Sequence, residues 1–132
     1  MKISERLNNV RLAFPECDTV AYADISTQTV LSSSAPDGLR QEHLNDLCAT
    51  AAGMFADPSS KELADLLAPA KGEAAAGEVY QVILMDAREV GIFLRSVSNP
   101  NDALCCLCDP SIDIAAFLPA VRLQLEEIGQ DS

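Results

Sequence analysis

The spacing of apolar residues predicts a helix at the start of the chain. Ile3, Leu7, Val10 and Phe14 recur at helical intervals, with polar residues between them. Pro15 cannot continue a regular helix, so we expect the helix to end just before it. The segment is therefore an amphipathic helix that offers one face to a core.

Two short strands joined by a tight turn are predicted next. The segment Thr19–Ser26 is partly β-branched or aromatic and alternates, so Val20 and Tyr22 share one face. Ser26–Gln28 reads as a polar turn, and Thr29–Ser33 returns as the second strand. The Ala-Pro-Asp-Gly sequence that follows breaks the sheet.

The clearest helical pattern in the chain covers Glu42–Phe55. Its apolar residues form one wide stripe, made of Leu44, Leu47, Cys48, Ala51, Met54 and Phe55. Asp57-Pro58 stops this helix, and Ser59 with Glu62 forms a capping-box pattern that predicts a short further helix. Residues 69–77 show no periodicity, and we expect a mobile loop there.

Three more strands and a last helix complete the pattern. Glu78–Met85 is rich in Val, Ile and Tyr, and a short hairpin turn connects it to Val90–Val97. Ala103–Cys108 is a nearly continuous apolar run, typical of a central strand that is buried on both faces. The last helix lies between Asp113 and Ile128, and either its regular part begins near Ala115 or it kinks at Pro119.

The predicted order is therefore α-β-β-α-β-β-β-α, with a short helix appended to the second one. Five strands connected mostly by hairpins form an antiparallel sheet, which the helices must cover. The predicted fold class is α+β, with two or three layers. The chain has 132 residues, and its length and lack of repeats or linkers predict a single domain over residues 1–132.

The charge balance excludes several classes of partner. Twenty Asp and Glu stand against nine Lys and Arg, which gives a formal net charge of −11. A nucleic-acid binder needs a basic surface, and an anionic membrane would repel this chain. No stretch approaches the roughly 20 apolar residues that span a bilayer, and the first residues are too polar for a signal peptide. We expect a cytoplasmic protein with no nucleic-acid partner and no membrane insertion.

The five cysteines offer the most visible candidate chemistry. Cys105 and Cys108 have the C-x-x-C spacing, but a second pair of ligands for zinc is absent. On a strand, these two side chains point to opposite faces, which opposes a shared metal or a disulfide. Cys106 and Cys108 share a face. We expect five free thiols and no bound metal, as in a reducing compartment.

No catalytic group stands out elsewhere. His43 and Cys48 are five residues apart on a helix and do not share a face, so a surface histidine is expected. Ser32–Ser34 lacks the glycines of a nucleophile elbow, and no glycine-rich phosphate loop occurs. The sequence therefore predicts a protein that is not an enzyme and that needs no cofactor.

The order of these segments resembles the Roadblock/LC7 domain family, including its bacterial MglB-like members. The matching segments are Val20–Asp24 with Thr29–Ser33, Glu42–Phe55, Glu78–Met85, Val90–Val97, Ala103–Cys108 and the last helix. The turn Ser26–Gln28 differs from the family in lacking a glycine. The resemblance implies a profilin-like fold. It also implies a non-catalytic homodimer that regulates Ras-like GTPases or serves as a scaffold in signalling complexes.

The resemblance further implies that the third strand pairs with its copy and the long helix packs beside its own copy. Two sequence features agree with such a dimer. Small residues flank the apolar stripe of Glu42–Phe55, and Glu78–Met85 is apolar on both faces, which is hazardous for a free edge. The residues expected at the dimer interface are Leu47, Thr50, Ala51, Met54, Tyr80, Val82 and Leu84.

Three alternatives stay open at this point. Glu78–Met85 could be an inner strand of a monomeric sheet. Type III secretion chaperones are also small acidic dimers, but they place three strands before the central helix and two after it. A thiol-based sensor or enzyme that uses Cys105–Cys108 is the third alternative.

Overall fold

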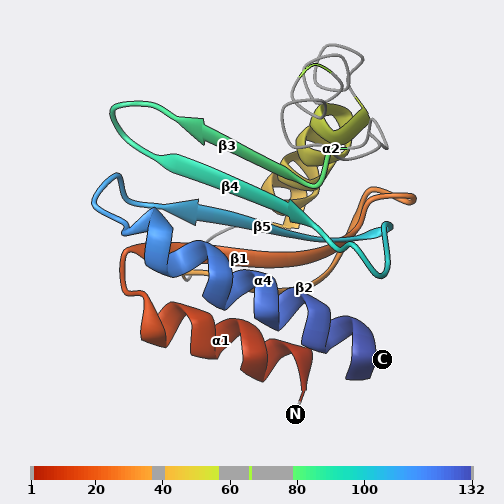
Figure 1. The fold of residues 1–132 in the computed structure, drawn as a ribbon, viewed down its shortest axis with the longest axis horizontal. Coiled ribbons are helices and arrows are strands. Elements are labelled where there is room, and N and C mark those ends of the chain that lie inside the picture. Colours follow the sequence, from red (N-terminus) through yellow and green to blue (C-terminus); the bar gives the residue numbers. More distant parts are fainter. Residues whose placement is uncertain (1, 37–40, 57–65, 67–78, 132) are drawn as a thin grey trace.

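Five strands form one antiparallel sheet, and the helices cover its two faces (Figure 1). The computed structural model describes residues 2–36, 41–56, 66 and 79–131. The elements are α1 (Ile3–Ala13), β1 (Cys17–Asp24), β2 (Thr29–Ser34), α2 (Gln41–Ala56), β3 (Gln81–Met85), β4 (Val90–Arg95), β5 (Asp102–Cys108) and α4 (Ile114–Asp131). This order confirms the predicted fold class.

The strand order in the sheet is β2-β1-β5-β4-β3. β5, which the apolar run predicted as a central strand, lies in the middle and pairs with both β1 and β4. Within residues 2–36, two strands precede the long helix α2, against the order of the type III secretion chaperones. β3 lies at an edge of the sheet, which rules out the alternative of an inner strand.

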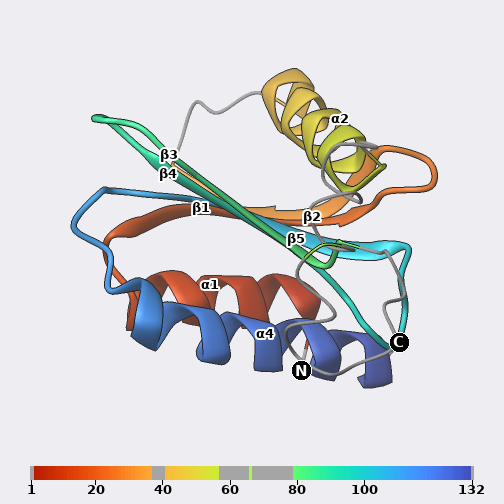
Figure 2. The same ribbon diagram turned by 45° about the horizontal axis from the view of Figure 1, so that its top comes forward.

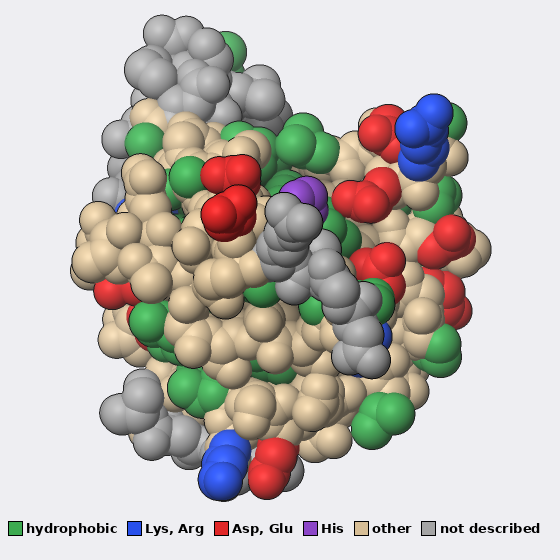
Figure 3. Space-filling view, turned by 180° about the vertical axis from the view of Figure 1, so that it is seen from behind, with side chains coloured by type: hydrophobic (Ala, Val, Ile, Leu, Met, Phe, Trp, Pro, Cys, Tyr) green, Lys and Arg blue, Asp and Glu red, His purple; other side chains and the backbone are tan. Residues whose placement is uncertain are grey.

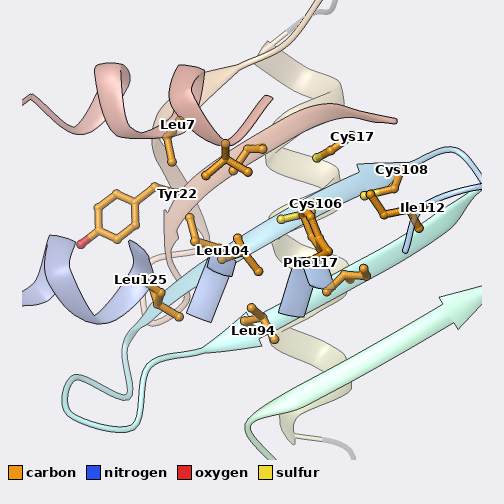
Figure 4. Packing of buried hydrophobic residues seen from close by; sticks show 14 of the residues in the cluster. Leu7, Cys17, Tyr22, Leu94, Leu104, Cys106, Cys108, Ile112, Phe117 and Leu125 are labelled. Atoms are coloured by element: carbon orange, nitrogen blue, oxygen red, sulfur yellow. The ribbon is translucent and has the colours of Figure 1, made fainter. Parts of the chain in front are cut away.

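Two apolar cores lie on opposite sides of the sheet. α1 and α4 lie side by side under one face, while α2 crosses the other (Figure 2). The larger core fills the space between the sheet and the helix pair, with Leu7, Leu104, Phe117 and Leu125 fully buried in it (Figure 4). The smaller core lies under α2 and includes Phe93. The sheet is therefore the middle layer of three.

Alternation along β1 places its side chains as predicted. Val20 and Tyr22 belong to the core on the α1 and α4 side, while Ala21 belongs to the core under α2. The turn after β1 lacks glycine, and Gln28 adopts a left-handed backbone with φ 55°. Gln28 therefore supplies the conformation that a glycine would adopt with less strain.

Several element boundaries differ from the predicted ones. β1 begins earlier, at Cys17, and β4 ends at Arg95 because the following backbone turns away toward α4. There the amide of Val97 donates a hydrogen bond of 3.1 Å to the Glu126 carboxylate. α4 begins at Ile114 and continues past Pro119.

Two predicted elements cannot be compared. The short helix expected after Ser59 and the loop at residues 69–77 lie outside the described residues, apart from Leu66. Among the described helices, none is long and apolar enough to cross a membrane.

Candidate interaction surface

β3 exposes apolar side chains at the edge of the sheet. Leu84 is 50% exposed and Met85 64% exposed, and Ile83 is exposed as well. Register fixes their faces: Val82 lies opposite Phe93, on the α2 side, and Ile83 lies opposite Ile92, on the other side. The strand is thus apolar on both faces, and the described residues of the protomer cover neither face fully.

The backbone of β3 has groups along the same edge that pair with no described strand. The Arg95 amide donates to the Tyr80 carbonyl at 2.8 Å, and the Asp86 amide donates to the Glu89 carbonyl at 3.0 Å. Backbone pairing alternates in an antiparallel ladder, so the even-numbered residues of β3 point their amides and carbonyls toward β4. Those of Gln81, Ile83 and Met85 point away from the sheet. A strand could add there without disturbing the existing ladder.

A groove separates β3 from α2 on the same side of the sheet. It has a volume of about 340 Å³, and we call it the β3–α2 groove. The residues that line it are Leu47, Thr50, Leu84, Met85, Asp86, Glu89, Gly91, Phe93 and Leu107. Its floor and one wall are apolar, while two carboxylates from the hairpin turn lie at its margin.

Three of the seven predicted interface residues line this groove, and four do not. Leu47, Thr50 and Leu84 line the groove. The other four do not line it: Met54 and Val82 are half-buried against the core beneath α2, Tyr80 is half-buried, and Ala51 is fully buried. Ala51 therefore contacts the protomer's own sheet.

The start of β3 is held by two arginines. The guanidinium of Arg95 lies 5.7 Å from the ring centroid of Tyr80 and 6.0 Å from that of Phe55. Arg122 of α4 donates to the Tyr80 carbonyl at 3.2 Å. These contacts fix the strand that carries the exposed apolar residues.

Sequence reasoning missed six residues that line the groove, namely Met85, Asp86, Glu89, Gly91, Phe93 and Leu107. Met85, Asp86 and Glu89 line the groove at the hairpin, and Phe93 forms part of its floor. The predicted hairpin turn puts Leu84 opposite Gly91, and counting forward two residues from Gly91 would have placed Phe93 on the face that Leu84 shares. The turn residues gave no comparable signal, because their placement depends on where α2 ends relative to the hairpin.

Comparison with known proteins finds similarity in the structure of this chain but not in its sequence. No family model matches the sequence, and no curated protein matches it. Solved structures match nearly the whole chain. A Roadblock/LC7 domain from Streptomyces avermitilis gives a TM-score of 0.71 at 14% identity, covering 98% of this chain and 97% of that one.

Two MglB structures give the same result. The gliding protein MglB from Thermus thermophilus has a TM-score of 0.74 at 16% identity, covering 98% of this chain and 90% of that one. MglB with a tetrameric arrangement has a TM-score of 0.74 at 16% identity, covering 97% and 85%. The chain has the Roadblock/LC7 fold. The predicted resemblance is confirmed at the level of structure, although sequence identity to these proteins is low.

The Roadblock/LC7 fold of this chain carries its acidic charge on the surface. Figure 3 shows the α2 side of the sheet, where acidic side chains are scattered among polar ones and His43 is exposed. The prediction of a surface histidine is confirmed. Cys48 is fully buried under the same helix, so the two residues do not form a nucleophile pair.

The cysteines of this Roadblock/LC7 fold occupy both faces of the sheet. Cys105 lies in the core under α2, while Cys106 and Cys108 lie in the core on the α1 and α4 side. The predicted opposite directions of Cys105 and Cys108 are confirmed. All five cysteines are free thiols, and the described residues hold no cluster of three or more ligands arranged for a metal ion.

Burial raises the pKa of Cys105 to about 12, and it also raises the pKa of Cys48. Both thiols therefore remain protonated at neutral pH, which removes them as nucleophiles.

Proposed function

We propose that this chain is a non-catalytic homodimeric regulatory or scaffold protein that acts in the cytoplasm, and that its partner is a small Ras-like GTPase. The observation that carries the proposal is the open edge of β3, where exposed apolar side chains and outward-pointing backbone groups lie together. The Roadblock/LC7 fold supports it, since MglB of that fold has been solved in a tetrameric arrangement.

A second copy of the chain is the occupant that fits this edge. A twofold axis places a strand antiparallel to its own copy, so the free amides and carbonyls of Gln81, Ile83 and Met85 would satisfy one another. The same axis brings the exposed side of one α2 toward the other. Leu84 and Thr50 would then be covered from outside the protomer.

The remaining surface is available to the partner protein. The net charge of −11 favours a partner that presents a neutral or basic face. The thiols of Cys48 and Cys105 are buried and protonated, and His43 is exposed on the surface, so these three residues supply no nucleophile and base for turnover of a small molecule. The proposal therefore assigns the chain to binding and not to turnover.

The dimer is tested by size-exclusion chromatography with light scattering at micromolar concentration. Ile83→Pro removes an amide that points away from the sheet and leaves the β3–β4 ladder intact, which an edge strand tolerates. Leu84→Arg places a charge on the groove side of the same edge. We expect the wild type to elute as a dimer and both variants as folded monomers.

Ala115→Arg is the matched control. This residue is exposed on α4, on the opposite side of the sheet, so the same charge should leave the dimer intact. A monomeric wild type would contradict the dimer, and so would dimeric Ile83→Pro and Leu84→Arg proteins.

Partner binding is tested by titrating purified small Ras-like GTPases, each loaded with GDP or a non-hydrolysable GTP analogue. We expect one nucleotide state of one GTPase to bind more tightly than the other. A dimer that binds no GTPase in either state would reject the assigned partner. Turnover of a small molecule by the purified protein would reject the non-catalytic role.

A further inference from the structure

We propose that Cys17 is an oxidation site for hydrogen peroxide, and that its oxidised sulfur forms a disulfide with Cys108 on the neighbouring strand. The site lies on the α1 and α4 side of the sheet, away from β3, so it goes beyond the proposed binding function. Three observations carry it: the register of β1 against β5, the clustering of three thiols, and a surface pocket that reaches Cys17.

Register places Cys17 directly opposite Cys108. The two residues are Cα partners in the antiparallel β1–β5 ladder, and both side chains belong to the core on the α1 and α4 side. The amide of Asp109 donates to the carbonyl of Glu16 at 2.7 Å. The adjacent pair Cys17–Cys108 is therefore of the non-hydrogen-bonded kind, in which side chains approach most closely, about 4.5 Å apart at Cα.

That spacing falls within the range of Cα separations that a disulfide spans. Cys106 lies on the same face two residues before Cys108, but its Cα partner in β1 is Val20. Figure 4 shows the three side chains together, with Cys17 on one strand and Cys106 and Cys108 on the other. Cys108 is the thiol that directly faces Cys17.

A shift in register brings Cys17 to this face. Between Cys17 and Thr19 the pairing with β5 shifts by one residue, so Asp18 is an extra residue in β1. Strict alternation from Val20 and Tyr22 would have put Cys17 on the α2 face, with Ala21. The bulge therefore creates the cluster.

Of the three clustered thiols, Cys17 is the one that lines a surface pocket, and its neighbours affect its ionisation. Hydrogen bonds from the Cys106 and Cys108 thiols lower the pKa of Cys17, and they outweigh its burial. The same interactions raise the pKa of Cys106 and of Cys108. Thiolate is the form of cysteine that reacts with peroxide, so the lowered pKa adds to the solvent access that selects Cys17 as the first thiol to react.

A pocket connects Cys17 to solvent. It lies between α1 and the start of β1 and has a volume of about 420 Å³. The residues that line it are Asn8, Arg11, Leu12, Pro15, Cys17 and Asp18. Cys17 is the only described cysteine among them, and peroxide is small enough to enter. Arg11 also lines this pocket and donates a hydrogen bond of 3.1 Å to the Ser34 hydroxyl, while the Asp18 carboxylate in the same lining opposes ionisation of Cys17 and raises its pKa.

The chemistry balances with hydrogen peroxide as the oxidant. The Cys17 thiolate attacks one peroxide oxygen, the O–O bond breaks, and hydroxide leaves, which yields a sulfenic acid on Cys17. The Cys108 sulfur then attacks the Cys17 sulfur, the S–O bond breaks, and the thiol proton of Cys108 leaves with the oxygen as water. The two cysteines lose two hydrogen atoms in total, and one peroxide is reduced.

The test uses the full chain in its reduced form. The protein is treated with hydrogen peroxide at neutral pH, its remaining thiols are alkylated in acid, and it is digested with trypsin. Cys17 falls in the peptide Leu12–Arg40, Cys48 in Gln41–Lys61, and the other three cysteines in Ser96–Arg122. We expect the first and third peptides to become linked, and Cys48 to stay alkylated.

Cysteine variants identify which thiol forms the disulfide with Cys17. Cys17→Ser and Cys108→Ser should lose the linked pair altogether, whereas Cys106→Ser and Cys48→Ser should keep it. In Cys108→Ser the sulfenic acid on Cys17 should accumulate and take up dimedone. Circular dichroism of each variant confirms that it is folded, and fragmentation of the wild-type linked peptides identifies the bonded cysteine where a variant does not fold.

A link through Cys106 in the folded wild type would overturn the assignment of Cys108. Oxidation of Cys48 or Cys105 ahead of Cys17, or no linked pair from folded protein, would overturn the site. Neither result bears on the dimer or on GTPase binding, which are read by light scattering and titration.

Discussion

The guanidinium of Arg122 donates a hydrogen bond of 3.2 Å to the backbone carbonyl of Tyr80, and so ties α4 to the start of β3. A second nitrogen of the same group donates to the carbonyl of Arg95 at 2.6 Å. The helix layer on one side of the sheet therefore holds the edge strand proposed to form the dimer. Positioning of that edge depends on a side chain remote from the β3–α2 groove.

Replacing Arg122 by Met should loosen β3. The variant keeps an apolar stem but loses both charge-assisted hydrogen bonds, so we expect the free energy of unfolding to fall by about 1 to 2 kcal/mol. Urea denaturation at fixed protein concentration measures this loss. Amide hydrogen exchange should quicken at Val82 and Leu84 more than in β1, and unchanged exchange in β3 would contradict the role given to Arg122.

Two leucines of α4 provide a matched pair for the larger core. Leu125 is fully buried, whereas Leu123 is 57% exposed on the same helix. Leu125→Ala removes packing and leaves a cavity, so it should cost about 3 kcal/mol of the free energy of unfolding. Leu123→Ala should change it by less than about 0.5 kcal/mol. Similar losses in the two variants would mean that α4 does not cover the sheet as described.

Glu126 should make the stability of the protein depend on acid pH. Burial opposes ionisation of this carboxyl, but hydrogen bonds from Ser98, Val97 and Ser96 outweigh it and lower the pKa of Glu126 below its ordinary value of 4.5. The stabilisation is therefore fully present above about pH 4.5 and is lost as the pH falls through the lowered pKa of the folded state. Glu126→Gln lacks this contribution.

The difference in unfolding free energy between wild type and Glu126→Gln should thus be largest at neutral pH and shrink in acid. Urea denaturation across that range measures it. Ser98→Ala removes one hydrogen-bond donor to Glu126. Its difference in unfolding free energy from wild type should be smaller than that of Glu126→Gln, and it should also shrink in acid. A difference that grows on acidification would refute the assignment.

Replacing Gln28 by glycine should stabilise the protein. Its left-handed backbone costs a residue with a side chain more than it costs glycine. Gln28→Gly should raise the free energy of unfolding by about 0.5 kcal/mol after the loss of chain entropy, and Gln28→Val should lower it by about 1 kcal/mol. Thermal and urea unfolding of the two variants and the wild type, at one protein concentration, measure whether the two changes in unfolding free energy have opposite signs.

The local spacing of apolar residues was sufficient to predict the order of the helices and strands. The apolar stripe of α2 and the alternation of Val20 with Ala21 are set by the geometry of one helix turn or one strand, so each can be seen within a few residues. The same alternation put Tyr80, Val82 and Leu84 on one face of β3. It could not show that Ala51 faces the protomer's own sheet, because burial depends on what packs against the helix.

The sequence by itself therefore determined which segments are helices and strands, and that Cys105 and Cys108 point apart. Only the tertiary structure decided that β3 is an edge, because strand order depends on pairing between segments far apart in the chain. It also decided the face of Cys17. An extra residue at Asp18 changes the alternation of β1, and the pairing with β5 that absorbs this residue is a long-range interaction that no local period reveals.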